Sequence, residues 1–466
     1  MSQISTKPPS GMRDFLAEEL VKRRHVIGVI QEVYESFGFV PLETPTIENL
    51  STLLGKYGPE GDQLLYRILH RREHLGRAVE DVARQWGKAG LEMPAAAKWA
   101  VFFSAAQGQL SDEGLRYDLT VPLARVVANY RDLPAFYKRY QIQPVWRADR
   151  PAKGRFREFY QCDVDVTGTT SIVADAEVCA AVASVLSKLG FDDFKIEVNH
   201  RELLRALVSD AGIPLESEGT ALIALDKLDK IGRDGVLKEL DERGIGPQRG
   251  EALMSGLEAA KTPGFLEERA KNTGASGAEG ARSLLELFAL ATQTPAQGKL
   301  RFAPELARGL SYYTGPIFEV SVPGLAGSMG GGGRYDGLIG MFTKQRIPAV
   351  GFSLGLERIL LVMEERAMFP ALAAGPQILV CRFPDVTAAE SLRAASDLRA
   401  QGLRVELYPE TEKLGKQLAY ATTIKASYAA VLGRAELDAG KIALKNLTTG
   451  EQRTLFMSEV AAVIRG

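Results

Sequence analysis

The sequence predicts an α+β fold followed by a separate α/β unit. Two extended runs joined by a basic loop lie between Tyr137 and Gly168, and a helix-rich stretch with few aromatic residues runs from about 213 to 295. From residue 376 onward, short apolar strands alternate with helical spacing, which is typical of a small α/β domain with a mostly parallel sheet. We therefore expect a main domain over 1–370, with the helical stretch as an insertion, and a second domain over 376–466.

Composition limits the possible functions. Charged residues make up 25% and hydrophobic residues 45% of the 466 residues, as in ordinary soluble globular proteins. The formal net charge of −1 excludes a general polycation but allows a local basic surface. No stretch has the roughly 20 apolar residues of a membrane helix, and no signal peptide is recognisable. We expect a cytoplasmic protein with no membrane contact, and the three scattered cysteines indicate neither disulfides nor a Cys metal site.

Near the amino terminus, apolar spacing predicts a helix over 18–37, followed by an extended segment whose prolines, Pro41 and Pro45, suit an edge or an interface. Further helices are expected over 71–87 and 173–189. His70 and His74 are spaced to reach one metal ion, but a closed zinc site needs four ligands and no further His or Cys lies nearby. Two solvated histidines are therefore favoured, and no metal is assigned to protein His or Cys residues.

The stretch from Leu115 to Tyr130 is expected to begin as a strand and to become helical after Pro122. Within the strand, Asp118 and Thr120 would point to the same face. A carboxylate and a hydroxyl so placed can accept hydrogen bonds from a substrate ammonium group. The alternative is that both residues only cap the helix.

Seven basic residues and a single acidic residue lie between Lys138 and Arg157, which predicts contact with a polyanion such as nucleotide phosphates or a nucleic acid backbone. In the strand that follows, period-two spacing places a polar row on one face and mostly apolar residues on the other. A solvated face is the default interpretation of such a row, and the lining of a cleft is the alternative. The row consists of Arg157, Phe159, Gln161, Asp163 and Asp165.

A second candidate stretch, LARGLSYYTGPIFEV from Leu306 to Val320, has the pattern of a strand. Alternation would then place Arg308 and Tyr312 on one face and Tyr313 on the other, unless a bulge intervenes. These three residues are candidates for chemistry. The alternative is a surface arginine beside aromatic core residues.

Two glycine-marked segments follow. Gly330–Gly333 are expected to form a functional turn that approaches a ligand closely, with a flexible linker as the alternative. The segment IPAVGFSLGLERILLVM predicts a strand that passes through Gly355 into a helix, where Arg358 could meet a phosphate at the helix amino terminus. No GxxxxGK[ST] motif is present, so ATP binding would not use a P-loop.

In the carboxyl-terminal part, strands are expected over 377–383 and 403–408, and helices over 388–400 and 414–428. A further strand, a hairpin around TTG and a last helix would complete the α/β unit.

Taken together, RADRPAKGRFREFYQCDVDVTG, RGLSYYTG, GGGGRYDGL and VGFSLGLERIL, in this order and before an α/β tail, closely resemble the histidyl-tRNA synthetase family of class II aminoacyl-tRNA synthetases. GMRDF and ETP near the amino terminus also resemble family motifs, the latter at a dimer interface. The resemblance implies an antiparallel catalytic sheet, a helical insertion, a homodimer and a carboxyl-terminal anticodon-binding domain.

The family also implies roles for residues that match its motifs. Asp118, Thr120 and Gln161 would hold the α-amino group of the bound histidine. Asp165 and Tyr313 would face the two imidazole nitrogens, because a neutral imidazole has one donor and one acceptor nitrogen. The implied histidine-binding set is Asp118, Thr120, Gln161, Asp165, Tyr312 and Tyr313.

For the reaction, Arg147 and Arg358 would clamp the phosphates of ATP together with Mg²⁺. Arg308, implied to be catalytic with Arg147, would stabilise charge while the histidine carboxylate attacks the α-phosphorus. The histidyl group would then pass from the adenylate to tRNA(His). The acceptor end of the tRNA would meet the basic loop through Arg150, Lys153 and Arg155.

Two features depart from the family pattern. Ser311 stands where the family usually has Asp, and the region between Ile68 and Leu115 is longer than expected. The competing hypothesis is a catalytically inactive relative, such as the synthetase-like regulatory subunit of ATP phosphoribosyltransferase. Such relatives typically lack the tail and the catalytic arginine, and this chain has both, so we favour the enzyme.

Overall fold

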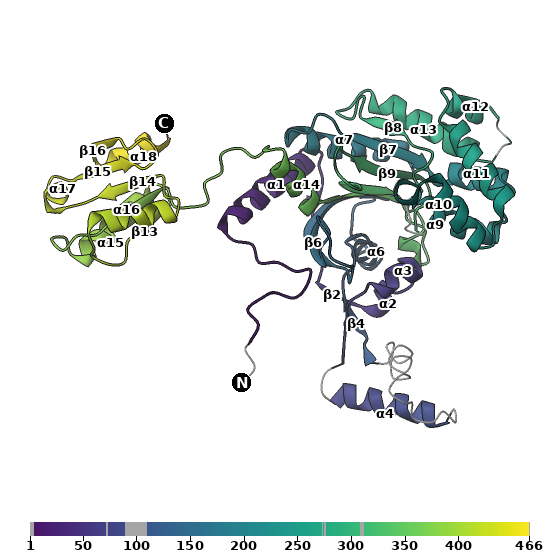
Figure 1. Cartoon of the computed structure of the whole chain (residues 1–466), viewed down its shortest axis with the longest axis horizontal. Helices are drawn as coiled ribbons and strands as arrows, with labels where there is room; N and C mark the ends of the chain where they lie inside the picture. The colour runs from purple at the N-terminus through teal and green to yellow at the C-terminus, as the bar shows by residue number, and fades with distance from the viewer. Residues whose placement is uncertain are drawn as a thin grey trace. The chain divides into compact units, whose positions relative to one another are not determined.

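The computed structural model describes residues 4–70, 73–88, 110–272, 274, 276–307 and 312–465. They form two compact units (Figure 1). The first contains residues up to Asp14 and His25–Met368, and the second contains Phe15–Arg24 and the chain from Phe369. Within the described part of the chain, no helix combines the length and apolar character needed to cross a membrane.

The first unit is built on an eight-stranded sheet with the order β1-β5-β6-β11-β10-β9-β7-β8. The inner neighbours are antiparallel, while the two outermost pairs, β1 with β5 and β7 with β8, are parallel. The predicted α+β class with an antiparallel main sheet is therefore confirmed. The strands are β1 (Val40–Pro41), β5 (Tyr137–Trp146), β6 (Glu158–Thr167), β7 (Lys195–His200), β8 (Leu300–Phe302), β9 (Pro316–Ser321), β10 (Gly330–Arg334) and β11 (Ala349–Gly355).

Helices α1 (Ala17–Ser36) and α7 (Ile172–Lys188) form close to where apolar spacing predicts them. α7 packs against β6 and β11, and its side chains are buried along most of its length. Tyr34 of α1 is fully buried, and its ring centroid lies 6.2 Å from that of Tyr140 on β5. Pro41 lies in edge strand β1, where a residue without a backbone N–H is tolerated.

The glycine-rich segment is an inner strand of the sheet, so both the predicted turn and the linker are wrong. β10 is hydrogen-bonded between β9 and β11. The residues are glycine because the neighbouring backbone is very close: a Cβ atom on Gly332 would lie 2.1 Å from the carbonyl oxygen of Gly351, and one on Gly330 would lie 2.5 Å from that of Ser353. The composition that resembled a flexible loop is thus a requirement of close strand packing.

Between β7 and β8 the chain forms a group of helices with their own apolar core (Figure 1, teal). Leu225, Leu240, Leu253 and Leu257 are buried in this core. The helices are α8 (Arg201–Asp210), α9 (Glu218–Leu225), α10 (Leu228–Glu242), α11 (Pro247–Ala260), α12 (Phe265–Lys271) and α13 (Ala278–Ala291).

A three-stranded sheet with the order β2-β4-β3 precedes the long hairpin of β5 and β6. Helix α6 begins at Thr120, two residues earlier than Pro122 suggests, and strand β4 ends at Leu115. The elements of this region are β2 (Ile47–Asn49), α2 (Leu50–Leu53), α3 (Gly58–Gln63), β3 (Arg67–Ile68), α4 (Glu73–Lys88), β4 (Glu113–Leu115) and α6 (Thr120–Asn129).

The second unit contains a five-stranded sheet with the order β13-β12-β14-β15-β16. Two neighbour pairs are parallel and two are antiparallel, so the prediction of a mostly parallel sheet is wrong for the hairpin half. The helix expected over 414–428 ends at Thr423, because Lys425 has a positive φ of 56° and Tyr428 starts β14. The elements are β12 (Ile378–Cys381), α15 (Ala388–Ala400), β13 (Val405–Leu407), α16 (Leu414–Thr423), β14 (Tyr428–Val431), α17 (Arg434–Asp438), β15 (Lys441–Asn446), β16 (Gln452–Phe456) and α18 (Val460–Arg465).

Candidate active site

The polar face of β5 and β6 is buried. In the register of this pair Arg139 lies opposite Asp165, Gln141 opposite Asp163, and Gln143 opposite Gln161. We call these six residues the polar row. Arg139 and Gln141 are fully buried, and Asp163 and Asp165 are 1% and 2% exposed. The predicted solvated face is therefore wrong, because alternation along a strand does not distinguish water from a buried polar surface.

Small residues on the neighbouring strand make room for the polar row. Gly351 pairs with Asp165 and Ser353 with Asp163. A Cβ atom on Gly351 would lie 1.8 Å from Asp165 Oδ1, so only glycine allows the carboxylate its present position. Ser353 Oγ accepts a hydrogen bond of 2.7 Å from Gln161 Nε2. β11 thus supports the side chains of β6 without covering them.

Asp165 has two different oxygen environments. Oδ1 accepts a short hydrogen bond from the Tyr335 hydroxyl. Oδ2 lies 2.8 Å from Arg139 Nη2 but accepts no hydrogen bond from the described residues. Burial raises the pKa of Asp165, and the Arg139 guanidinium and the Tyr335 hydroxyl oppose that shift. One oxygen of a buried carboxylate is therefore available to a donor from outside the protein.

Sequence reasoning missed Tyr335. Its signal was present in the RYDGL motif, directly after the glycines, but only the glycines were assigned a role. Tyr335 is 1% exposed, and its backbone N–H donates to the carbonyl of Ala349, which aligns it with β11.

Asp118 lies in a pocket of tyrosines. Its Oδ1 accepts from the Tyr57 hydroxyl at 3.2 Å and from the backbone N–H of Val121 at 3.0 Å, and its Oδ2 lies 3.5 Å from the Tyr312 hydroxyl. Burial raises the pKa of Asp118. The capping alternative is therefore correct for one oxygen, which binds the first turn of α6. The strand alternation assumed for Asp118 and Thr120 is wrong, because β4 has already ended, although the Thr120 side chain does bond to Tyr312.

The predicted strand over 306–320 begins only at Pro316. Tyr312 and Tyr313 precede it, so alternation does not apply to them. Their ring centroids are 5.0 Å apart, and Tyr312 lies 6.0 Å from Tyr335. Tyr313 lies against β10, where a Cβ atom on Gly333 would come within 2.9 Å of its ring. Both tyrosines therefore reach the region of Asp118 and Asp165, whereas Arg308 and Ser311 lie outside the described residues.

Arg147 and Arg358, the two arginines predicted to bind the phosphates of ATP, each donate a hydrogen bond to a backbone carbonyl. Arg147 Nε donates to the carbonyl of Tyr117 at 3.0 Å, and its guanidinium lies 4.2 Å from the centroid of the Tyr117 ring and 5.1 Å from that of Phe159. Arg358, in the first turn of α14 (Leu356–Glu365), donates to the carbonyl of Ser328. Stacked and anchored guanidinium groups of this kind are suited to binding phosphates.

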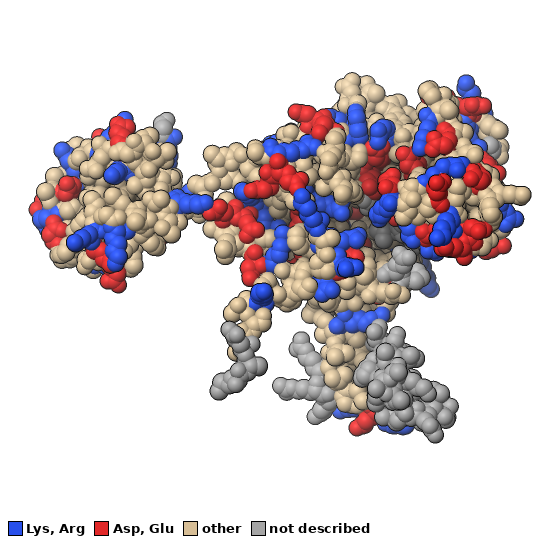
Figure 2. All heavy atoms as spheres, in the orientation of Figure 1, with Lys and Arg blue, Asp and Glu red and all other residues tan. Residues whose placement is uncertain are grey.

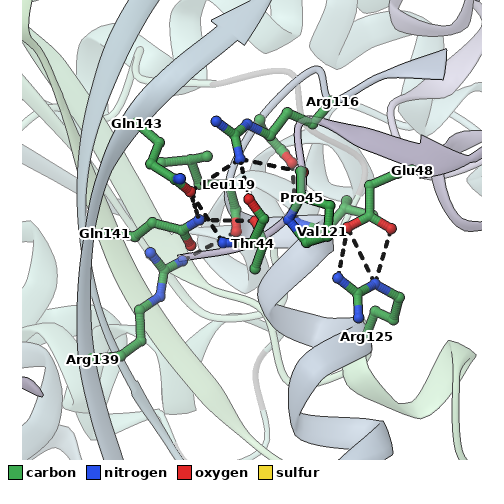
Figure 3. A network of polar contacts seen from close by, with 11 residues as sticks. Thr44, Pro45, Glu48, Arg116, Leu119, Val121, Arg125, Arg139, Gln141 and Gln143 are labelled. Atoms are coloured by element: carbon green, nitrogen blue, oxygen red, sulfur yellow. Dashed lines mark hydrogen bonds and ion pairs between the residues drawn. The ribbon is translucent and has the colours of Figure 1, made fainter. Parts of the chain in front are cut away.

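A buried network connects the ETP segment to this region (Figure 3). Arg116 is 1% exposed and donates to the carbonyl of Thr44 at 2.6 Å. Gln141 Nε2 donates to Thr44 Oγ1 at 2.9 Å, and Arg125 of α6 pairs with Glu48 at 2.7 Å. These contacts tie α6, and with it the loop of Asp118, to the segment that leads into β2. Sequence reasoning assigned no role to Arg116 or Arg125.

The basic loop is exposed. Lys153 pairs with Glu365 at 2.6 Å, and Arg155 lies 3.9 Å from Asp149, while Arg150 is exposed without such a pair in the described part of the chain. Elsewhere basic and acidic atoms alternate over the visible face (Figure 2). His70 lies 3.3 Å from Asp112, and the described residues contain no group of three or more His, Cys, Asp or Glu side chains that could hold a metal ion. Residues 89–109, which make up 21 of the 46 residues between Ile68 and Leu115, are outside the described residues.

The second unit has a groove of its own, with a volume of about 840 Å³, along edge strand β13. Three arginines and one acidic residue, Glu406, line it among apolar residues such as Leu392 and Leu403. Arg399 and Arg404 are exposed. The arginines are Arg382, Arg399 and Arg404.

A mainly antiparallel sheet with a buried polar face, anchored arginines and an appended α/β unit defines a class II aminoacyl-tRNA synthetase. The family model of histidyl-tRNA synthetase matches residues 69–359, and that of the anticodon binding domain matches residues 378–466. The chain belongs to the histidyl-tRNA synthetase family.

Similar proteins agree with this assignment. The histidine–tRNA ligase of Cytophaga hutchinsonii is 40% identical over 459 residues, which cover 97% of this chain and 98% of that protein. A crystal structure of histidyl-tRNA synthetase from Nostoc sp. PCC 7120 has a TM-score of 0.77 and 28% identity, covering 99% of each chain. A Bacillus halodurans structure described as an ATP phosphoribosyltransferase regulatory subunit/histidyl-tRNA synthetase has a TM-score of 0.71 with 93% of this chain and 100% of that one covered, but at 21% identity it shows the fold alone.

Proposed function

We propose that the protein attaches L-histidine to tRNA(His) in an ATP-dependent reaction that passes through histidyl adenylate. The observation that carries the proposal is the buried Asp165 carboxylate, one oxygen of which accepts no hydrogen bond from the described residues, although Arg139 Nη2 lies 2.8 Å away. An imidazole N–H is a donor of suitable size and chemistry. Because a buried acceptor without a donor destabilises the complex, an amino acid that lacks this N–H would bind less tightly.

The remaining histidine contacts would come from the tyrosine pocket and from the polar row. Asp118 and Thr120, together with Gln161, would receive the α-ammonium group. The buried Gln161 Oε1 accepts no hydrogen bond from the described residues and is thus available to an N–H donor. Tyr313, and Tyr335 next to Asp165, would supply the hydroxyl groups around the imidazole. Tyr312 would position Asp118 through its hydroxyl.

The positions of residues along β6 support a particular arrangement of histidine and ATP in the site. Asp165 and Gln161 are four residues apart, or roughly 13 Å at the usual rise of a strand. Gln161 lies opposite Gly355, and Arg358 follows three residues later, while Arg147 directly follows the end of β5. The imidazole would thus lie at one end and the phosphates of ATP at the other. The histidine carboxylate between them would attack the α-phosphorus.

Arg147, Arg358 and Arg308 would compensate the negative charge that develops on the phosphates. Mg²⁺ would enter with ATP as part of the substrate, because the phosphates and water commonly supply most of its ligands.

For tRNA, the exposed loop with Arg150, Lys153 and Arg155 would contact the acceptor end. The arginine-lined groove of the second unit would contact nucleotides of the anticodon, because guanidinium groups beside apolar surface suit both phosphates and bases. We further propose a homodimer in the cytoplasm, with the ETP segment at the interface.

Histidine-dependent exchange of pyrophosphate into ATP tests the first step, and aminoacylation of purified tRNA with histidine tests the second. Exchange that requires histidine, and is absent with other amino acids, is expected. The alternative is the regulatory subunit, which would show no exchange. A complete lack of exchange, in an assay where a known synthetase is active, would refute the proposal.

A further inference from the structure

Arg139 is a fully buried arginine behind the imidazole end of the site. It lies on β5 directly opposite Asp165 on β6. Its Nη2 is 2.8 Å from Asp165 Oδ2 and 3.8 Å from Asp163 Oδ2. The same nitrogen donates to the carbonyl of Leu119 at 3.2 Å (Figure 3). One guanidinium therefore touches both the carboxylate at one end of the site and the loop between Asp118 and Thr120.

The ion pair that Arg139 forms with the two carboxylates leaves several buried polar atoms without a hydrogen bond among the described residues. Arg139 Nε and Nη1 are buried and have no hydrogen-bond partner there. Asp163 Oδ1 and Asp165 Oδ2 likewise accept no hydrogen bond there. Buried ion pairs contribute to stability only when such atoms are satisfied, and otherwise an apolar replacement is often as stable. Stability alone does not explain why this arginine is present.

The positive charge of Arg139 gives a reason for its presence. Two carboxylates, Asp163 and Asp165, share one guanidinium in a buried environment. Burial raises the pKa of both groups, and Arg139 is the main opposing influence on each. An ionised carboxylate accepts a hydrogen bond from an imidazole N–H more strongly than a protonated carboxyl group does. The other titratable groups that influence this site are the hydroxyls of Tyr335 and Tyr34 and the carboxyl group of Asp118, and none of them is cationic.

We propose that Arg139 is a positioning residue for the histidine side chain, whose guanidinium holds Asp165 ionised and in place to accept the imidazole N–H. The inference rests on the proposed histidine specificity of the site. Asp165 is the favoured partner because it is 1 Å closer to the guanidinium than Asp163. Asp163 lies farther from the guanidinium and accepts a hydrogen bond from the Ser353 hydroxyl, which also opposes the rise of its pKa.

The test is the pH dependence of kcat/KM for histidine in pyrophosphate exchange. Arg139→Met removes the charge, so the pKa of Asp165 should rise and the acidic limb of the profile should move upward by about 1–3 pH units. The KM for ATP should stay within about twofold. A triazole analogue of histidine, whose ring stays neutral in this range, should give the same shift, which excludes titration of the substrate as its cause.

Two further variants separate charge from folding. Arg139→Met with Asp163→Asn removes one charge of each sign, which lessens the repulsion between buried carboxylates, yet Asp165 still loses its counter-ion. The acidic limb should again move upward. Asp163→Asn alone should not move it upward. Circular dichroism and thermal unfolding establish that each variant is folded.

A wild-type pH profile in the folded double variant would overturn the proposal, and so would failure of the double variant to fold, which would make Arg139 a structural residue. A lack of histidine-dependent exchange in the wild-type protein would instead refute the proposed function, so the two failures are distinguishable.

Discussion

β6 and β12 are both buried inner strands, but they use their two faces differently. In β12 every residue is at most 2% exposed, and successive side chains enter two apolar clusters, Ile378 and Val380 on one side and Leu379 on the other. In β6 one face is apolar, while the other carries Gln161, Asp163 and Asp165. Burial alone therefore does not identify a structural strand. The chemistry of each face distinguishes a strand that only stabilises the fold from one that also binds a ligand.

The largest expected effect on stability is in β12. Leu379→Ala should lower the free energy of unfolding of the second unit by about 2–5 kcal/mol, because it creates a cavity in a dry cluster. Histidine-dependent pyrophosphate exchange should be unchanged, since the exchange site lies in the first unit. Calorimetry and the exchange assay measure the two quantities. Loss of exchange in a folded variant would show that β12 also supports the active site.

Among changes to activity, Arg308→Ala should reduce adenylate formation by about 100–1000-fold, because a fixed cation near the α-phosphorus is lost. Histidine binding should be retained, since the arginine acts on the phosphate. Equilibrium binding of histidine and single-turnover adenylate formation are the measurements. If both fall equally, Arg308 is a binding residue only.

Gly351→Ala tests the polar face of β6 directly. The new methyl group would occupy the position of Asp165 Oδ1, 1.8 Å away, so the carboxylate must move. Displacement of a positioned group by about 1 Å can reduce activity by about 100-fold, and we expect this loss in kcat/KM for histidine. Gly219→Ala in α9 is the matched control, because no atom lies within 4 Å of the added Cβ. Equal activity of the two variants would contradict the assigned role of Asp165.

The smallest effect is expected for Tyr335→Phe, which removes the hydroxyl that donates to Asp165 Oδ1 and leaves the buried ring in place. Loss of one hydrogen bond to a charged group corresponds to about 1.5–3 kcal/mol, or roughly 10–150-fold in kcat/KM for histidine. The loss should be larger at low pH, because the hydroxyl helps to keep Asp165 ionised. A loss that is independent of pH would assign Tyr335 to packing alone.

The period of the hydrophobic pattern by itself determined most of the elements. α1, α7, α15 and the pair β5 and β6 lie where apolar spacing placed them, because burial of one face imposes periods of 3.6 and 2 on the sequence. Motif order identified the family, and with it most of the candidate site. Prediction from local composition was less reliable for the glycine-rich segment. The composition of β10 resembles that of a loop, and only the close backbone of the neighbouring strands explains why its residues are glycine.

Only the tertiary structure decided which polar groups are buried together. Alternation along β6 gave two faces but not their environment, since a polar row facing water and one facing a second polar strand have the same sequence pattern. Arg139 and Asp165 are 26 positions apart in the chain, and Tyr335 is a further 170 positions from Asp165. Their contact depends on strand register and on the space left by Gly351, which are set by packing over the whole sheet and not by any local segment.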